Sequence, residues 1–342
     1  MRPYVIVLSS PDCSAIDGLL STLAAGFSSV EAPEFQSEAT TYAHELPRGL
    51  RSGLNFFRLQ EPSSACVISG FHVEDGRIGP TPASWKLNAS PQRTLREEVF
   101  FFLCASLIGD PIAWSTKQGG HIMHDIVPVR EEADEQLASS STTALTYHTE
   151  DGFHPLRPDY VGLMCLRNPD NVSTTLGGVE DILLSQRYRE ILSEPRFLIV
   201  PDGSHLTSAS APESRISGPL QARARERIHR MHGNPQRTPL LFGDPAAPYL
   251  RLDQVYARAV PGDAEAAEAL KELHANIERN LTKYCLRPGE IVFIDNYRAV
   301  HGRERFRAWY DGRDRWLKRL NITRDLRKSR YLRESPASRL IA

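Results

Sequence analysis

The sequence lacks any long apolar run. No segment approaches the roughly 20 apolar residues that cross a membrane as a helix. The apolar stretch at residues 4–8 is too short for a signal peptide, and Pro11 and Asp12 follow it at once. We therefore expect neither a membrane partner nor a secretion signal.

Cysteine is scarce and unpatterned. The cysteines are odd in number and form no C-x-x-C motif, which argues against both a disulfide scaffold and a zinc ribbon. This pattern indicates a reducing, cytoplasmic location. The five residues are Cys13, Cys66, Cys104, Cys165 and Cys285.

An excess of charge of either sign is also missing. The chain has 41 Lys and Arg against 42 Asp and Glu, a formal net charge of −1. Without a basic footprint, we expect no nucleic-acid partner. No G-x-G-x-x-G motif opens a βαβ unit, which sets aside a Rossmann fold, and no H-E-x-x-H motif supports a zinc hydrolase.

What the sequence does contain is a series of short strand-like runs joined by turns, with helical patterns mainly at the front and one near the end. A length of 342 residues allows one large β-rich domain or two small ones. We expect a mainly β fold with flanking helices, built on a jelly-roll core, which is a double-stranded β-helix. Such a core would bring strands that are distant in sequence to one point.

One pattern offers ligands for a metal ion. His148 and Glu150 are two residues apart next to a strand-prone segment, and side chains two apart in a strand share a face. His301 follows the apolar run at residues 291–294. Two histidines and one carboxylate on one side of a metal form the facial triad of non-haem Fe(II) oxygenases, which leaves positions open for oxygen and a co-substrate.

That pattern alone is weak, because eleven histidines in 342 residues produce such pairs by chance. The alternative without a metal is a solvent-exposed strand whose histidine has ordinary hydrogen-bond partners. Arg315 strengthens the metal interpretation: it stands fourteen residues after His301, just before another strand-like run. A guanidinium there can bind a carboxylate bidentately, as a 2-oxo acid co-substrate requires.

Further polar residues are candidates for a pocket. Gln118 precedes a Gly-Gly turn, although a solvated turn residue is an equally good interpretation. Thr174 and Thr175 point to opposite faces of a strand, so only one can enter a pocket. Asp253 ends a strand; its bland alternative is a helix cap or a surface acid. Arg319 lies four residues past Arg315, on the same strand face.

Two other histidines, His121 and His124, are three residues apart, which is the wrong phase for one strand face. We expect them to be structural. Residues 202–238 are polar and then charged, and we interpret them as a solvated helix or disordered insert that is also placed where lids are found.

Five motifs carry a family resemblance. They are HTEDGFH at 148–154, CLRNPD at 165–170, FGD at 242–244, DNYRAVHGR at 295–303 and DGRDRW at 311–316. On these residues the sequence resembles the clavaminate synthase-like Fe(II)/2-oxoglutarate oxygenases of the TauD/TfdA superfamily, in particular the hydroxylases of free arginine, asparagine and lysine. The resemblance covers roughly residues 90–330. It implies one oxygenase domain over 1–342, with α/β padding at 1–90 and the jelly roll at 90–330.

The resemblance implies a metal and a co-substrate. Fe(II) would be bound by His148, Glu150 and His301. Arg315 would bind the distal carboxylate of 2-oxoglutarate, and Thr175 is the expected helper. Molecular oxygen would be the oxidant.

The resemblance also implies how an amino acid would bind. Arg319 would take the substrate α-carboxylate, Gln118 the α-amino group, and Asp253 would face the end of the side chain. Arginine hydroxylases of this group tend to present two acids near that last position. Here the residue two further on is Val255, which counts against arginine and leaves lysine, citrulline and asparagine open.

The expected reaction is therefore hydroxylation at C3 or C4 of a free L-amino acid, lysine or arginine first, coupled to formation of succinate and CO2. Citrulline, asparagine or a carrier-bound amino acid are alternative substrates, and desaturation is an alternative outcome. More distant alternatives are a zinc hydrolase, in which Arg315 would have no role, and a non-enzymatic jelly-roll binding protein. The sequence does not indicate an oligomeric state.

Overall fold

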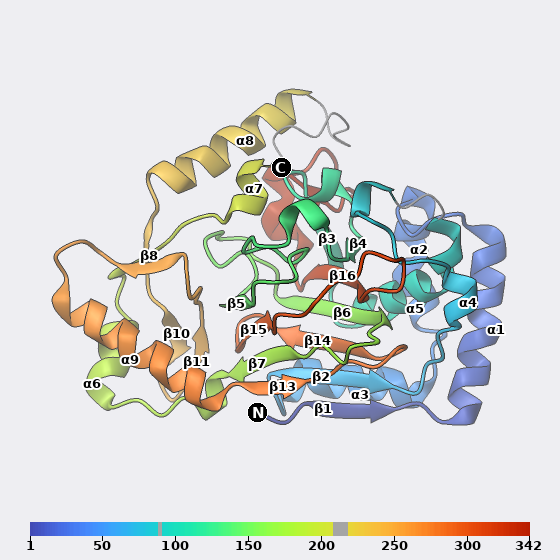
Figure 1. Ribbon diagram of the computed structural model, residues 1–342, viewed down its shortest axis with the longest axis horizontal. Coiled ribbons are helices and arrows are strands. Elements are labelled where there is room, and N and C mark those ends of the chain that lie inside the picture. Colours follow the sequence, from blue (N-terminus) through green and yellow to red (C-terminus); the bar gives the residue numbers. More distant parts are fainter. Residues whose placement is uncertain (88–90, 208–217) are drawn as a thin grey trace.

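The computed structural model describes residues 1–87, 91–207 and 218–342. Two β-sheets form its centre (Figure 1). The large sheet has the order β1-β2-β14-β6-β16-β3-β17, with β4 also paired to β16. Its strands are β1 (Tyr4–Val7), β2 (Ala65–Ser69), β14 (Ile291–Asp295), β6 (Tyr160–Arg167), β16 (Trp316–Thr323), β3 (Asp110–Trp114), β17 (Leu340–Ile341) and β4 (His124–Ile126).

The small sheet has the order β13-β7-β15-β5 and is antiparallel throughout. Its strands are β13 (Thr282–Tyr284), β7 (Thr174–Gly178), β15 (Ala299–Arg303) and β5 (Leu145–His148). One apolar cluster joins the two sheets, because it combines Leu176 and Ala299 of the small sheet with Val67, Val292 and Leu317 of the large one. The sheets therefore pack face to face.

The N-terminal helices cover the other face of the large sheet (Figure 1). They are α1 (Ser10–Gly26), α2 (Pro33–Ala43), α3 (Arg48–Gln60), α4 (Asp75–Ile78) and α5 (Leu95–Ser106). A single cluster joins Phe35, Leu54 and Phe101 from these helices to Phe293 and Leu320 of the sheet. Because strands β6 and β14 are covered on both faces, every residue in them is buried and their sequences are almost continuously apolar.

A second group of elements packs at the opposite side of the molecule (Figure 1). It contains a three-stranded sheet and a hairpin, with two helices, and it shares a cluster with Tyr147 and Val300 of the small sheet. Asp263 caps one of these helices by accepting the Ala266 amide at 3.1 Å. The elements are β8 (Phe197–Ile199), β9 (Arg237–Thr238), β12 (Ala257–Ala259), the hairpin β10 (Leu241–Asp244) and β11 (Ala247–Leu250), α6 (Gln186–Leu192) and α9 (Ala264–Asn280).

Where it is described, the insert expected at 202–238 is mainly helical and ends in a short strand. It contains α7 (Gly203–Thr207) and α8 (Gly218–Gly233) and leads into β9. Part of the expected lid, residues 208–217, lies outside the described residues. Among the helices of the described ranges, none is long and apolar enough to span a bilayer.

Candidate metal centre

The two histidines of the predicted triad face each other across neighbouring strands. His148 on β5 is the direct cross-strand partner of His301 on β15, and their ring centroids are 4.6 Å apart. The strands approach so closely at this point that a Cβ atom on Gly302 would lie 2.5 Å from the Leu145 carbonyl oxygen. Glycine beside His301 therefore allows β5 to lie against β15 and the two imidazoles to converge.

The third ligand reaches the site from a turn rather than from the strand. Strand β5 ends at His148, so the expected alternation of side chains along a strand is not what directs Glu150. Instead, the buried side chain of Asn296 fixes the turn: its Oδ1 accepts the Glu150 amide at 2.6 Å, and its Nδ2 donates to the Glu150 carbonyl at 2.9 Å. The prediction was right about convergence and wrong about its cause.

Together the three side chains offer a compact ligand set. One ligand atom from each lies within 4.8 Å of the others. Glu150 Oε2 is 3.8 Å from His148 Nε2 and 3.7 Å from His301 Nε2. The other ring nitrogen of His148 lies 2.8 Å from the Thr146 carbonyl, which leaves Nε2 directed at the shared point. These two nitrogens and one carboxylate oxygen fit a non-haem Fe(II) ion.

Two cations fix which oxygen of Glu150 faces the histidines. Lys117 Nζ lies 3.0 Å and Arg319 Nη1 lies 3.2 Å from Oε1, so Oε2 is the oxygen free for a metal. Burial alone would raise the pKa of Glu150, but Arg319 and Lys117 hold it well below its usual value. The carboxylate is therefore ionised and ready to bind a cation.

The imidazoles differ in the metal-free protein. Burial would lower the pKa of His148, but the hydrogen bond and charge of Glu150 outweigh burial and raise this pKa to about 9. Burial and the neighbouring His148 lower the pKa of His301 to about 3. His148 is therefore the protonated imidazole of the two at neutral pH, and a metal ion bound at its Nε2 would replace that proton.

A cavity of about 290 Å³ opens from the triad. Its lining contains seven of the eight residues singled out from the sequence, namely Gln118, His148, Glu150, Asp253, His301, Arg315 and Arg319. Arg315 is buried, and its Nε has no hydrogen-bond partner among the described residues. Burial lowers the pKa of Arg315 to about 10, so an anion at this guanidinium would relieve a real electrostatic cost.

The eighth residue, Thr175, is absent from this lining, and its neighbour Thr174 is present. Thr174 is buried and is the cross-strand partner of Arg303. Thr175 is the partner of Gly302, and its Oγ1 would lie 2.9 Å from a Cβ atom added to that glycine. Strand alternation makes the two positions exclusive. The structure therefore places Thr174, and not the expected Thr175, at the wall of the cavity.

The two candidates for the amino-acid head group are held by neighbours. Gln118 Nε2 donates to the Asp125 carbonyl at 3.0 Å. Arg319 Nη2 lies 2.8 Å from Nδ1 of His124, a buried ring that supports the guanidinium and lies outside the triad. His121 has a half-exposed side chain and also lies outside the triad.

Two carboxylates line the cavity at a second place. Asp253 bridges to His148 through the backbone, and its Oδ1 accepts the amides of Val255 at 2.8 Å and Tyr256 at 2.7 Å. Burial raises the pKa of Asp253, and the charge of Asp202 acts in the same direction. Neither Asp202 nor Asp253 forms an ion pair with a Lys or Arg of the described residues. Sequence reasoning missed Asp202, because it lies in an insert without periodicity.

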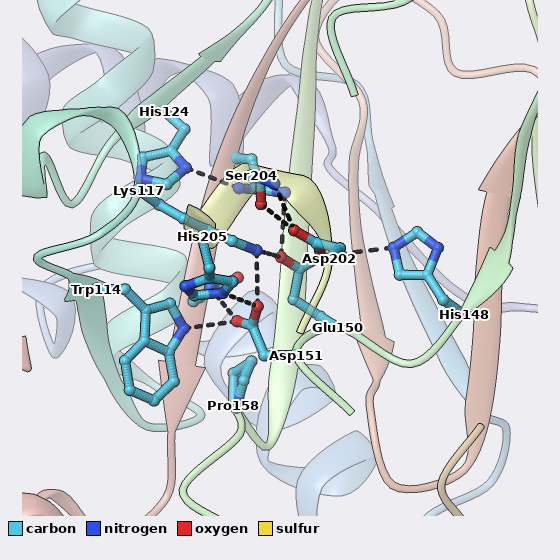
Figure 2. A network of polar contacts seen from close by, with 12 residues as sticks. Trp114, Lys117, His124, His148, Glu150, Asp151, Pro158, Asp202, Ser204 and His205 are labelled. Atoms are coloured by element: carbon cyan, nitrogen blue, oxygen red, sulfur yellow. Dashed lines mark hydrogen bonds and ion pairs between the residues drawn. The ribbon is translucent and has the colours of Figure 1, made fainter. Parts of the chain in front are cut away.

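Behind the triad lies a buried polar network centred on Asp151 (Figure 2). Lys117 Nζ lies 2.6 Å and His205 Nε2 lies 2.8 Å from Oδ1, and Trp114 Nε1 donates to Oδ2 at 2.5 Å. Burial would raise the pKa of Asp151, but Lys117 holds it below its usual value. The network had no sequence signal beyond adjacency, since Lys117 precedes Gln118 and Asp151 follows Glu150.

Comparison with known proteins places the chain in a family. Residues 104–321 match the family described as taurine catabolism dioxygenase TauD, TfdA family. The chain belongs to this family. This family depends on Fe(II) and 2-oxoglutarate and uses O2 as the oxidant, which confirms the expected metal, co-substrate and oxidant. Its fold has a jelly-roll core, which confirms the expected fold.

Three similar proteins cover nearly the whole chain. An enduracididine beta-hydroxylase of Streptomyces hygroscopicus is 46% identical over 98% of both chains. An L-ornithine/L-arginine 3-hydroxylase of Catenulispora acidiphila is 42% identical, over 98% of this chain and 99% of that one. The crystal structure of the non-heme iron oxygenase OrfP with Fe, succinate and (3S)-hydroxy-L-Arg superposes with a TM-score of 0.92, at 38% identity over 99% of both chains.

Proposed function

We propose that this dioxygenase hydroxylates C3 of a free L-amino acid with a cationic side chain, arginine before ornithine or lysine, with succinate and CO2 as co-products. The observation that carries the proposal is the pair of carboxylates, Asp202 and Asp253, in the same cavity as the triad. Two acids that form no ion pair with a Lys or Arg of the described residues suit a guanidinium or ammonium group. Neutral citrulline or asparagine would leave both acids unpaired, which is costly for half-buried charges.

The head of the substrate would be held beside the metal. Arg319 offers its guanidinium to the α-carboxylate, and Gln118 and the Oε1 edge of Glu150 accept hydrogen bonds from the α-ammonium. With both ends of the amino acid fixed, the carbon nearest the metal is set by geometry. Bound Fe(II) supplies the oxidising chemistry, and the chain supplies orientation and exclusion of water.

The sequence had counted against arginine, because Val255 stands where a second acid was expected. In the structure Val255 is half-exposed, and the second acid comes instead from Asp202, some fifty residues earlier in the chain. The objection to arginine therefore loses its basis. The names of the similar proteins support a beta-carbon, or C3, as the site of hydroxylation, and OrfP was captured with (3S)-hydroxy-L-Arg.

Two broader assignments belong to the same proposal. The N-terminal helices share one apolar cluster with the large sheet, which supports a single oxygenase domain over the whole chain. All five cysteines are free thiols, which supports a cytoplasmic location.

The test is a panel of free amino acids incubated with enzyme, Fe(II), 2-oxoglutarate and oxygen. L-arginine, L-ornithine, L-lysine, L-citrulline and L-asparagine are compared by succinate release, and products by mass spectrometry and NMR. We expect arginine to gain one oxygen at C3. The Asp253→Asn variant should lower kcat/KM for arginine about tenfold or more relative to citrulline, while the exposed Asp244→Asn control should not. If none of arginine, ornithine and lysine is hydroxylated in this assay, the proposal is refuted.

A further inference from the structure

We propose that His205 is a positioning residue. Its hydrogen bond to the buried carboxylate of Asp151 holds Asp202 in the cavity and thereby sets the preference for a cationic substrate. The inference rests on the proposed function. Neither Asp151 nor His205 lines the cavity, so His205 acts through Asp202 rather than by touching substrate.

His205 is fixed on every side. Its Nε2 lies 2.8 Å from Asp151 Oδ1, and since a carboxylate only accepts, Nε2 carries the hydrogen. Its Nδ1 lies 2.7 Å from the Thr116 hydroxyl. Phe153 meets the ring edge-to-face at a centroid distance of 5.0 Å, and Trp114 does so at 6.2 Å. The imidazole therefore has both a defined position and a defined orientation.

The group that receives His205 is itself rigid. Asp151 is buried and also binds Lys117, Trp114 and the amide of Asn321, whose Nδ2 is 3.5 Å from Oδ2. It follows the metal-binding Glu150 directly, and Lys117 bridges the two carboxylates (Figure 2). The anchor for His205 is thus part of the structure that holds the triad.

The segment that His205 anchors carries Asp202. Between Asp202 and Leu206, His205 is the one buried side chain, with 3% exposure, and the other four residues are intermediate. Asp202 starts this turn: its Oδ1 accepts the Ser204 amide at 2.8 Å. The His205 amide donates to the Asp202 carbonyl at 3.3 Å, so one closed turn ties the backbone of Asp202 to the anchored imidazole.

The position of His205 affects substrate preference through the charge of Asp202. Burial would raise the pKa of Asp202, but Lys117 and His205 act to lower it, which places this carboxylate in the field of the same network. Displacing His205 would move Asp202 toward solvent, where its attraction for a guanidinium is screened. The loss should fall on cationic substrates and spare neutral ones.

The test compares His205→Phe, which keeps an aromatic ring but removes both hydrogen bonds, with His205→Gln, which keeps a donor for Asp151. His229→Phe, on the exposed face of α8, is the matched control. The first readout is hydrogen–deuterium exchange of amides 203–206 without substrate, which is independent of the proposed function. The second is the ratio of kcat/KM for arginine to that for citrulline, measured also in Asp202→Asn and in the double variant.

We expect faster exchange and an arginine/citrulline ratio about tenfold lower in His205→Phe, mainly through KM for arginine, with partial rescue by His205→Gln. The double variant should discriminate no worse than Asp202→Asn alone, since both changes act through one carboxylate. Unchanged exchange, an unchanged ratio, or fully additive losses would each overturn the inference. So would equal losses on arginine and citrulline, which would mean that His205 supports the triad instead. If the wild-type enzyme hydroxylates no cationic amino acid, the proposed function fails and this inference fails with it.

Discussion

Lys117 Nζ lies 3.0 Å from Oε1 of Glu150, and this contact leaves the other oxygen of Glu150 facing both histidines. The same ammonium binds Asp151 at 2.6 Å, so one buried cation serves two adjacent buried carboxylates. Without Lys117, a pair of like charges would be left facing each other in a low-dielectric site. Lys117 thus shapes the ligand set without belonging to it.

Replacing Lys117 by Met should therefore destabilise the metal-free protein strongly. Breaking a buried pair on one side costs about 3 to 5 kcal/mol, because the remaining charge stays buried. Urea unfolding measures the loss. Lys283→Met is the matched control, because its pair with Glu304 is solvent-exposed and should change the free energy of unfolding by less than about 1 kcal/mol. Equal effects of the two variants would contradict the assigned role.

The neighbouring threonines of β7 give a second prediction. Thr174→Val should raise KM for 2-oxoglutarate by roughly 2- to 10-fold, the value of one hydrogen bond, because Thr174 lines the cavity. Thr175→Val is the control of equal size on the other face, and it should leave KM for 2-oxoglutarate unchanged. Steady-state kinetics at saturating amino acid separates the two. A larger effect at Thr175 would restore the original assignment.

Asp295 predicts a pH dependence of stability. It ends β14 with its side chain buried, and burial raises its pKa from 3.8 to about 7. An acid that holds its proton more tightly when folded makes folding less favourable as pH rises. The free energy of unfolding should thus fall between about pH 4 and pH 7, by at most about 1.4 kcal/mol per pH unit, and level off above.

Asp295→Asn keeps an oxygen for the Tyr297 amide, which now donates to Asp295 Oδ1 at 2.9 Å, and removes the charge. The variant should flatten that part of the pH profile, as measured by denaturant unfolding at a series of pH values. Asp170→Asn, in an exposed turn, should reproduce the wild-type slope. The free energy of unfolding of Asp295→Asn is subtracted from that of the wild type at each pH. If this difference rises from pH 4 to pH 7, the account of this residue is wrong.

Much of the site was predictable because its signals are local. His148 and Glu150 are close in sequence, although a turn rather than strand alternation directs Glu150. Arg315 and Arg319, four residues apart, both line the cavity. The apolar run at residues 291–294 likewise indicated the strand that the structure shows as β14. What linked the pairs across the chain was the family resemblance, not periodicity.

The rest depends on contacts that no local pattern encodes. Asp202 and His205 belong to an insert without periodicity. Their roles become visible only in the folded chain, where His205 of α7 contacts Asp151. Asn296 fixes the turn of Glu150 from a distant strand end. The choice between Thr174 and Thr175 depends on the register of β7, and a shift of one residue reverses it.

The most direct test of the metal centre is the visible spectrum of the anaerobic enzyme with Fe(II) and 2-oxoglutarate. We predict a weak charge-transfer band in the wild type, none in His301→Ala, and a band in Arg315→Ala that needs about tenfold or more 2-oxoglutarate to reach half intensity. The exposed His121→Ala control should keep the wild-type band. A wild-type enzyme without the band, or a full band in His301→Ala, would contradict the account.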